Sequence, residues 1–247
     1  MATFIPSGPV THEQLGHGGG VTEPPVRGGG DEGQGDEGSD YVGRLRRARL
    51  GVAVAIAAVV MIFVSLTSAY IVRQGLPTFD SPSSSYVRDW GEVSLPLALL
   101  IMNTAVLLIS SVTMEGARRS ITRQSALAPV TSIPGVSLGE ERRFPWLGLT
   151  VVLGIGFLAG QFLAWSELRR RGFFIPTNPN SSFVYLFTGV HAVHLAGGVL
   201  ALLWAGMTSL LDKPIESRRI VIDVTAWYWH FMALLWVYVF ALLEFAR

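Results

Sequence analysis

The chain has 247 residues, of which 50% are hydrophobic and 15% are charged, and its formal net charge is +1. It contains no cysteine, which excludes disulfides, iron–sulfur clusters, a Cys-linked haem and a thiolate copper centre. The near-zero net charge gives no indication of nucleic-acid binding. The charged residues gather in a tail and in loops and leave long uncharged stretches, which is typical of an integral membrane protein.

The first 40 residues form an acidic segment with 11 glycines, seven acidic residues and one arginine. This composition buries too little apolar surface to offset the entropy lost on folding, so we predict a flexible tail over residues 1–43. Its Glu32, Asp36 and Glu37 are interpreted as part of a solvated linker rather than a cation site. The tail lacks a cationic start followed by a short apolar run, so no cleaved signal peptide is expected.

Five uncharged stretches follow the tail, and each predicts a membrane-spanning helix, since about 20 apolar residues cross the hydrocarbon core. They are Leu50–Val72, Val93–Met114, Phe144–Ser166, Gly172–Leu211 and Val224–Leu243. The fourth stretch, of 40 residues, is too long for one span, and its Ile175–Asn180 segment has the composition of a loop. We therefore predict an all-α bundle of five transmembrane helices over residues 44–247, with helices at about 48–73, 93–115, 144–168, 182–211 and 221–245.

The positive charges predict the orientation of these helices. Twelve Lys and Arg residues flank the helices on the side of the tail, and six lie on the other side. The side with more positive charge is normally cytoplasmic. We therefore expect a multi-pass protein of a bacterial-type inner (plasma) membrane, with the N-terminus in the cytoplasm and the C-terminus outside. The outer Arg169–Arg171 run departs from this rule and is interpreted as a helix-end anchor.

Small residues within the third and fourth predicted helices indicate close packing against other helices. These residues are Gly154, Gly156, Gly160, Gly197 and Gly198. The amides Asn103 and Gln161 are interpreted as hydrogen-bonding groups between helices. No Asp or Glu lies inside an uncharged stretch, and Asp223 and Glu244 only bracket the fifth helix. A buried proton relay would therefore lack its usual carboxylate.

Three histidines lie in the uncharged stretches, where an imidazole usually lines a bundle interior or a cavity. His191 and His194 share one face of the fourth helix, and His230 lies in the fifth. A rise of about 1.5 Å per residue places all three at similar depth, so they converge if the two helices are neighbours. Two interpretations are open at this point: a metal or haem site, and hydrogen bonds to Ser, Thr, Trp, backbone or lipid headgroups.

The fourth and fifth predicted helices each contain a distinctive sequence motif. Thr-Gly-x-His-x-x-His-x-x-x-Gly runs from Thr188 to Gly198, and Tyr-Trp-His-Phe runs from Tyr228 to Phe231. An Asn-Thr pair followed by a Ser-Ser pair in the second helix and a Gly-Gln pair in the third add weaker support. Together, from roughly Arg44 to the C-terminus, these segments resemble subunit III of the haem–copper terminal oxidases, the cytochrome c oxidase family.

The resemblance implies a non-catalytic accessory subunit of a proton-translocating cytochrome c oxidase, which works in the electron transport chain of aerobic respiration. In that family the haems and copper belong to subunits I and II, the expected partners of this chain. Subunit III carries no redox centre, binds membrane phospholipids and stabilises the catalytic subunit. The five-helix form lacks the first two helices of the seven-helix form. No activity is expected from the isolated chain.

The chain departs from the family at positions where a carboxylate is often found. Val59 precedes the Val-Met-x-Phe run in place of a Glu, and Ala164 follows Gly-Gln where a Glu is expected. A proton-buffering role is therefore not carried over, and a structural and lipid-binding role is favoured. We expect no catalytic, cofactor-binding or metal-binding residues. The expected lipid-binding or interface residues are His191, His194, Trp227, Trp229 and His230.

Two alternatives remain open from the sequence. A quinol oxidase or a nitric-oxide-reductase-associated complex also fits the resemblance, because the electron donor binds to another subunit. A stand-alone membrane carrier of b-type haem is an alternative from a different class, since two histidines on different helices are common haem ligands. Identifying the partner subunits would show which type of oxidase the chain belongs to. A visible spectrum of the isolated chain would show whether it carries haem.

Overall fold

The computed structural model describes residues 32–80, 84–87, 90–91, 93–131, 145–175, 178–211 and 214–245. Its elements are α1 (Glu32–Gly75), β1 (Thr78–Asp80), β2 (Ser85–Val87), α2 (Leu97–Thr131), α3 (Trp146–Arg170), α4 (Pro179–Leu210) and α5 (Ile215–Phe245). Each of the five helices contains a stretch that is long and apolar enough to span a membrane. The prediction of an all-α fold with five spanning helices is therefore confirmed.

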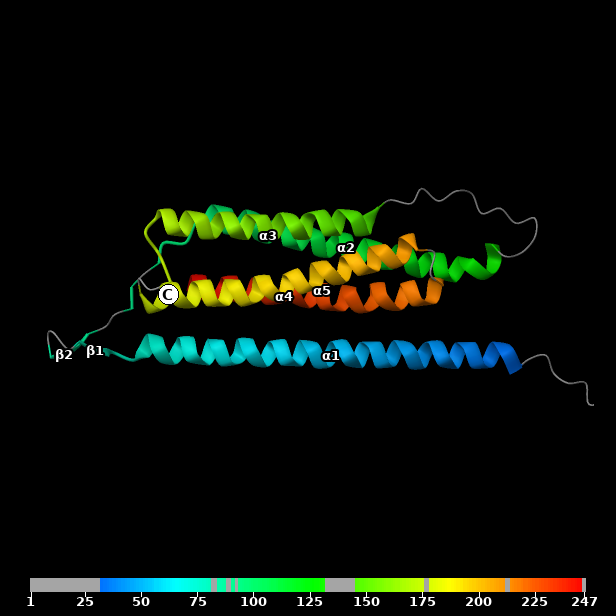
Figure 1. The fold of residues 1–247 in the computed structure, drawn as a ribbon, viewed down its shortest axis with the longest axis horizontal. Helices are drawn as coiled ribbons and strands as arrows, with labels where there is room; N and C mark the ends of the chain where they lie inside the picture. The colour runs from blue at the N-terminus through cyan, green and yellow to red at the C-terminus, as the bar shows by residue number, and fades with distance from the viewer. Residues whose placement is uncertain are drawn as a thin grey trace, which may run out of the picture. The chain divides into compact units, whose positions relative to one another are not determined.

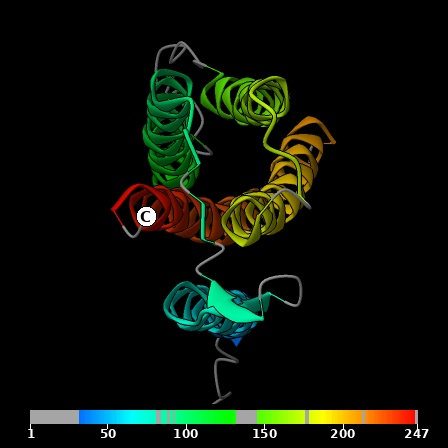
Figure 2. The same cartoon turned by 90° about the vertical axis from the view of Figure 1, so that its left-hand side faces the viewer.

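Four of the helices form a closed bundle (Figure 2). α2 packs against α3 and α5, and α4 packs against the same two helices. From Ser39 onward α1 belongs to the same compact unit as the bundle and runs beside it (Figure 1). Over the described residues, no Cα atom of α1 lies within 8 Å of a Cα atom in another helix. α1 is therefore held by long side chains, such as Phe63, whose ring centroid lies 6.2 Å from that of Phe187 on α4.

Most helices are longer than predicted, because hydropathy marks only the part of a helix that crosses the apolar layer. α1 begins at Glu32 rather than near residue 48, and α2 ends at Thr131 rather than near residue 115. The additional part of α2 is rich in Arg and Ala, which favour the helix where it leaves the apolar layer. Residues 1–31 of the predicted tail lie outside the described residues, and residues 32–43 belong to α1.

The connections between helices were harder to predict than the helices. α4 begins at Pro179 rather than near residue 182, because the Asn178 side chain caps it. The Oδ1 atom of Asn178 accepts a hydrogen bond of 2.7 Å from the backbone N–H of Ser181. β1 and β2 form a hairpin in which Phe79 pairs with Tyr86. This hairpin was not predicted, since three-residue strands are too short to show an alternating pattern.

Two of the predicted small residues allow a tryptophan to lie between helices. A Cβ atom at Gly154 on α3 would lie 2.7 Å from the ring of Trp229, and one at Gly198 on α4 would lie 3.2 Å from it. Only glycine leaves room for the indole at the first of these positions. Gly197 differs, because a Cβ atom there meets nothing within 4 Å.

A pair of glycines on α3 provides a test of this packing. Gly160→Ala is expected to destabilise the bundle by about 1–3 kcal/mol, because the added methyl group would collide with the amide of Asn103 on α2. Gly156→Ala is the matched control, since a Cβ atom there meets nothing within 4 Å. Unfolding of the purified chain in detergent, followed by circular dichroism, measures both changes. Equal losses for the two variants would contradict the packing described here.

Candidate functional site

His191 lies inside the four-helix bundle, and none of its surface is exposed. Its ring centroid is 5.0 Å from that of Trp236 on α5 and 5.9 Å from that of Phe157 on α3. Neither ring nitrogen has a hydrogen-bond partner among the described residues. Within this part of the chain, His191 is therefore held by aromatic packing.

His194 lies nearly one turn further along α4 and faces α1 rather than the bundle interior. Its ring centroid is 6.4 Å from that of Phe63. Its Nδ1 atom lies 2.8 Å from the carbonyl oxygen of Val190, and because a carbonyl only accepts, Nδ1 carries the proton. The carbonyl oxygen of His194 accepts a hydrogen bond of 3.0 Å from the hydroxyl of Tyr228 on α5. His194 thus links α4 to α1 through its ring and to α5 through its backbone.

His230 lies on the face of α5 that packs against α2. Its Nδ1 atom is 2.5 Å from the hydroxyl oxygen of Ser111, and its Nε2 atom is 3.6 Å from a carboxylate oxygen of Glu115. These three residues line an open pocket of about 450 Å³, to which Arg119 and Trp146 also contribute. The pocket therefore combines a carboxylate, a guanidinium group, an imidazole and an indole at its surface.

The three histidines do not form a common site. α4 and α5 are neighbours, as expected, but His191 faces the bundle interior, His194 faces α1 and His230 faces α2. In the part of the chain that the structure describes, no three His, Cys, Asp or Glu side chains are arranged to hold a metal ion. The expected convergence was therefore wrong, because equal depth in a membrane does not specify how each helix is rotated about its axis.

The two predicted tryptophans of α5 lie in different environments. Trp229 is fully buried, and its Nε1–H donates a hydrogen bond of 3.1 Å to the hydroxyl of Ser110 on α2. Trp227 is 47% exposed, and its ring centroid lies 5.6 Å from the guanidinium carbon of Arg49 on α1. Trp229 therefore belongs to the core between α2, α3 and α4, whereas Trp227 contacts α1 at the surface.

An acidic residue that was predicted only to bracket the fifth helix lies at the centre of an ion-pair network. Asp223 on α5 is buried, and its Oδ2 atom accepts hydrogen bonds from Nη2 and Nε of Arg49 on α1, at 2.8 and 3.0 Å. Its Oδ1 atom accepts one from Nε of Arg118 on α2, at 2.9 Å. The network continues through Glu115, which pairs with Arg118 and Arg119 at 3.2 and 2.9 Å. One carboxylate thus joins three helices.

A signal for this network is present in the sequence. Asp223, Arg49 and Arg118 each lie at or near the end of an uncharged stretch, and the alternating direction of the helices brings these ends to the same side of the membrane. Charged groups at that depth usually pair with one another. The sequence did not reveal which helices are neighbours, and so the partners of Asp223 were not predicted.

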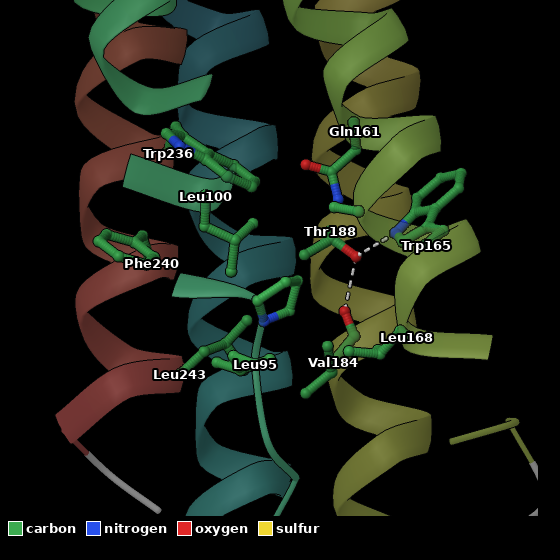
Figure 3. Close-up of a pocket in the computed structure, with 12 residues that line it drawn as sticks. Leu95, Leu100, Gln161, Trp165, Leu168, Val184, Thr188, Trp236, Phe240 and Leu243 are labelled. Carbon is green, nitrogen blue, oxygen red and sulfur yellow. Dashed lines mark hydrogen bonds between the residues drawn. The ribbon is translucent and has the colours of Figure 1, made fainter. Parts of the chain in front are cut away.

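Figure 3 shows a cavity between α2, α3, α4 and α5. Its lining includes Leu95, just before α2, and Leu243, near the end of α5, which places it at the opposite end of the bundle from Asp223. Its volume is about 20 Å³, and most of the side chains around it are apolar. The hydroxyl of Thr188 accepts a hydrogen bond from Nε1–H of Trp165 and donates one to the carbonyl of Val184. Gln161 and Trp236 line opposite sides of the cavity.

Comparison with known proteins identifies the family. A family model described as cytochrome c oxidase subunit III matches residues 37–246. The chain belongs to this family. The probable cytochrome c oxidase subunit 3 of Nocardia farcinica is 25% identical over 80% of this chain and 87% of its own length. The cytochrome c oxidase subunit 3 of Corynebacterium diphtheriae is 26% identical over the same shares, and that of Synechocystis is 26% identical over 78% and 72%.

The resemblance seen in the two sequence motifs is thereby confirmed. As a member of the subunit III family, the chain is an accessory subunit of a cytochrome c oxidase, which is an oxidoreductase complex. It is a multi-pass membrane protein that assembles with other oxidase subunits. The subunit III family carries no redox centre of its own.

Proposed function

We propose that this subunit III is a non-catalytic structural component of a proton-translocating oxidase, where it stabilises the catalytic subunit I and binds phospholipid. The observation that supports this role is that its polar side chains join helices to one another. Asp223 binds residues of α1 and α2, and Trp229 on α5 lies between α2, α3 and α4. A bundle joined in this way offers a rigid surface to a larger partner.

Trp227 and His230 are assigned to phospholipid binding. Trp227 is half-exposed beside Arg49, and His230 lines the open pocket with Arg119. Indole rings favour the headgroup region of a membrane, and guanidinium groups bind phosphate oxygens. The other three predicted residues, His191, His194 and Trp229, are assigned to the contact between α4 and α5.

The proposed partners are subunits I and II, which supply the haems and copper, and the N-terminus is proposed to be cytoplasmic. The orientation is supported by the cluster of basic residues at one end of the helices, which includes Arg44, Arg49, Arg118 and Arg119.

Purification of the tagged full chain from its native membrane tests the proposal. We expect haem-containing partners in the complex and a colourless chain once they are removed. A stoichiometric Soret band in the isolated chain would identify a haem carrier and overturn the proposal.

His230→Ala tests the lipid assignment. The variant removes the ring that contacts Ser111 and Glu115 and that lines the open pocket. The purified complex is expected to retain less phospholipid and to dissociate more readily, with an unchanged haem spectrum. Phosphorus content, native gel electrophoresis and visible spectra measure these effects. Val193→Ala, at a 71% exposed position of α4, is the control, and equal lipid content in the His230 variant and the wild type would contradict the assignment.

A further inference from the structure

Three polar side chains in the interior of the bundle have unpartnered atoms. Asn103 on α2, Gln161 on α3 and His191 on α4 are 3%, 2% and 0% exposed. Among the described residues, no hydrogen-bond partner exists for Nδ2 of Asn103, Oε1 of Gln161 or either ring nitrogen of His191. Buried polar atoms are rarely left unpartnered, because each loses its hydrogen bonds to water on burial.

His191 packs against Trp236, Gln161 shares a cavity with it, and Asn103 is next in sequence to the residue that Trp236 bonds. The ring centroid of His191 is 5.0 Å from that of Trp236, and Gln161 and Trp236 line the same cavity (Figure 3). The Nε1–H of Trp236 donates a hydrogen bond of 2.9 Å to Thr104, the residue that follows Asn103. Asn103 itself lies against Gly160, the neighbour of Gln161. The unpartnered atoms therefore belong to one region of the core rather than to three separate defects.

The chemistry of this group restricts what it can bind. The unpartnered amide atoms are a donor on Asn103 and an acceptor on Gln161, and a neutral imidazole offers one of each. The three residues carry no formal charge when the imidazole is neutral, so a metal cation or an anion would find no compensating charge among them. The group thus suits a small neutral molecule that both donates and accepts hydrogen bonds.

We propose that Asn103, Gln161 and His191 form an internal hydration site, in which ordered water bridges α2, α3 and α4 inside the membrane. The inference does not depend on the role in an oxidase. Bridging water satisfies the buried amides and the imidazole without a direct contact between them. It also explains how His191 is tolerated in a fully buried aromatic environment.

Water-edited solid-state NMR tests the proposal on the full chain in phospholipid bilayers. Histidine and tryptophan are labelled with nitrogen-15, and magnetisation is transferred from water protons to the ring nitrogens. We expect rapid transfer to His191 even though its ring is fully buried. Trp229 is the internal control, because it is equally buried but its Nε1–H is bonded to Ser110. Transfer to His191 that is as slow as transfer to Trp229 would overturn the proposal.

His191→Phe provides an independent measurement, because it keeps a ring in the core and removes both ring nitrogens. If water bridges the three residues, the variant leaves the others less satisfied, and the thermal midpoint falls by at least about 2 °C. If nothing is bound, the variant removes an unpartnered polar group, and the midpoint stays constant or rises. The second outcome contradicts the proposal. If the variant does not fold, the NMR experiment on the wild-type chain still decides.

Discussion

Trp229→Ala is expected to lower the free energy of unfolding by about 3–5 kcal/mol, one of the largest effects of any single substitution in this chain. The indole is fully buried and fills the space that Gly154 and Gly198 leave open on α3 and α4. Its removal creates a cavity that two rigid helix backbones cannot close. It also removes the hydrogen bond to Ser110 on α2.

Two further tryptophan variants make this test specific. Trp227 lies two residues away and is 47% exposed. Trp227→Ala is expected to lower the free energy of unfolding by about 1 kcal/mol or less, mainly because the contact with Arg49 is lost. Trp229→Phe keeps an aromatic ring but loses the hydrogen bond, and should fall between the two alanine variants. Unfolding in mixed detergent micelles, followed by circular dichroism, gives all three values. A similar loss for both alanine variants would show that Trp229 does not join the helices as described.

Asp223→Ala is expected to lower the free energy of unfolding by about 2–3 kcal/mol and to loosen the contact between α1 and the bundle. Removing one member of a buried ion pair usually costs about 3–5 kcal/mol, because the other charge is left uncompensated. The expected cost is smaller here, since the side chains of Arg49 and Arg118 are 42% and 35% exposed. At the opposite end α1 remains attached through Tyr70, whose ring centroid lies 5.4 Å from that of Phe183 on α4.

The absence of cysteine makes the position of α1 straightforward to measure. Single cysteines at the exposed Val54 and Val193 accept spin labels, and pulsed electron paramagnetic resonance gives the distance between α1 and α4. We expect a broader distance distribution in Asp223→Ala than in the wild type. Glu216→Ala is the control, because its pair with Arg44 is exposed on both sides and should contribute at most about 1 kcal/mol. An unchanged distribution in the Asp223 variant would refute its role in holding α1.

The number of helices and their order could be predicted from the sequence because membrane thickness sets a minimum length for an apolar span. Helix ends could not, since they depend on local contacts such as the cap that Asn178 provides to α4. Hydropathy also ignores helical residues that extend into water, such as those of α2 beyond Glu115.

The positions of the three histidines along the helices could be predicted from the sequence, but their surroundings could not. The motifs identified His191, His194 and His230 correctly as polar groups inside the membrane helices, and the residues toward which each points became known only with the structure. The rotation of a helix depends on all its neighbours at once, as the position of Trp229 between three helices illustrates. The ion pairs of Asp223 could not be predicted for the same reason, because both of its arginine partners are distant in sequence.

The ion pairs of Asp223 also have a consequence for how the chain is made. Arg49 precedes Asp223 by 174 residues and Arg118 precedes it by 105. Ribosomal synthesis proceeds from the N-terminus. Arg49 and Arg118 therefore reach the membrane surface before Asp223, which binds both of them, has been translated. The carboxylate that pairs with the arginines of α1 and α2 therefore arrives only with α5. A nascent chain truncated before residue 223 is expected to hold its first helix only through aromatic contacts with α4 and to be cleaved more readily by membrane proteases.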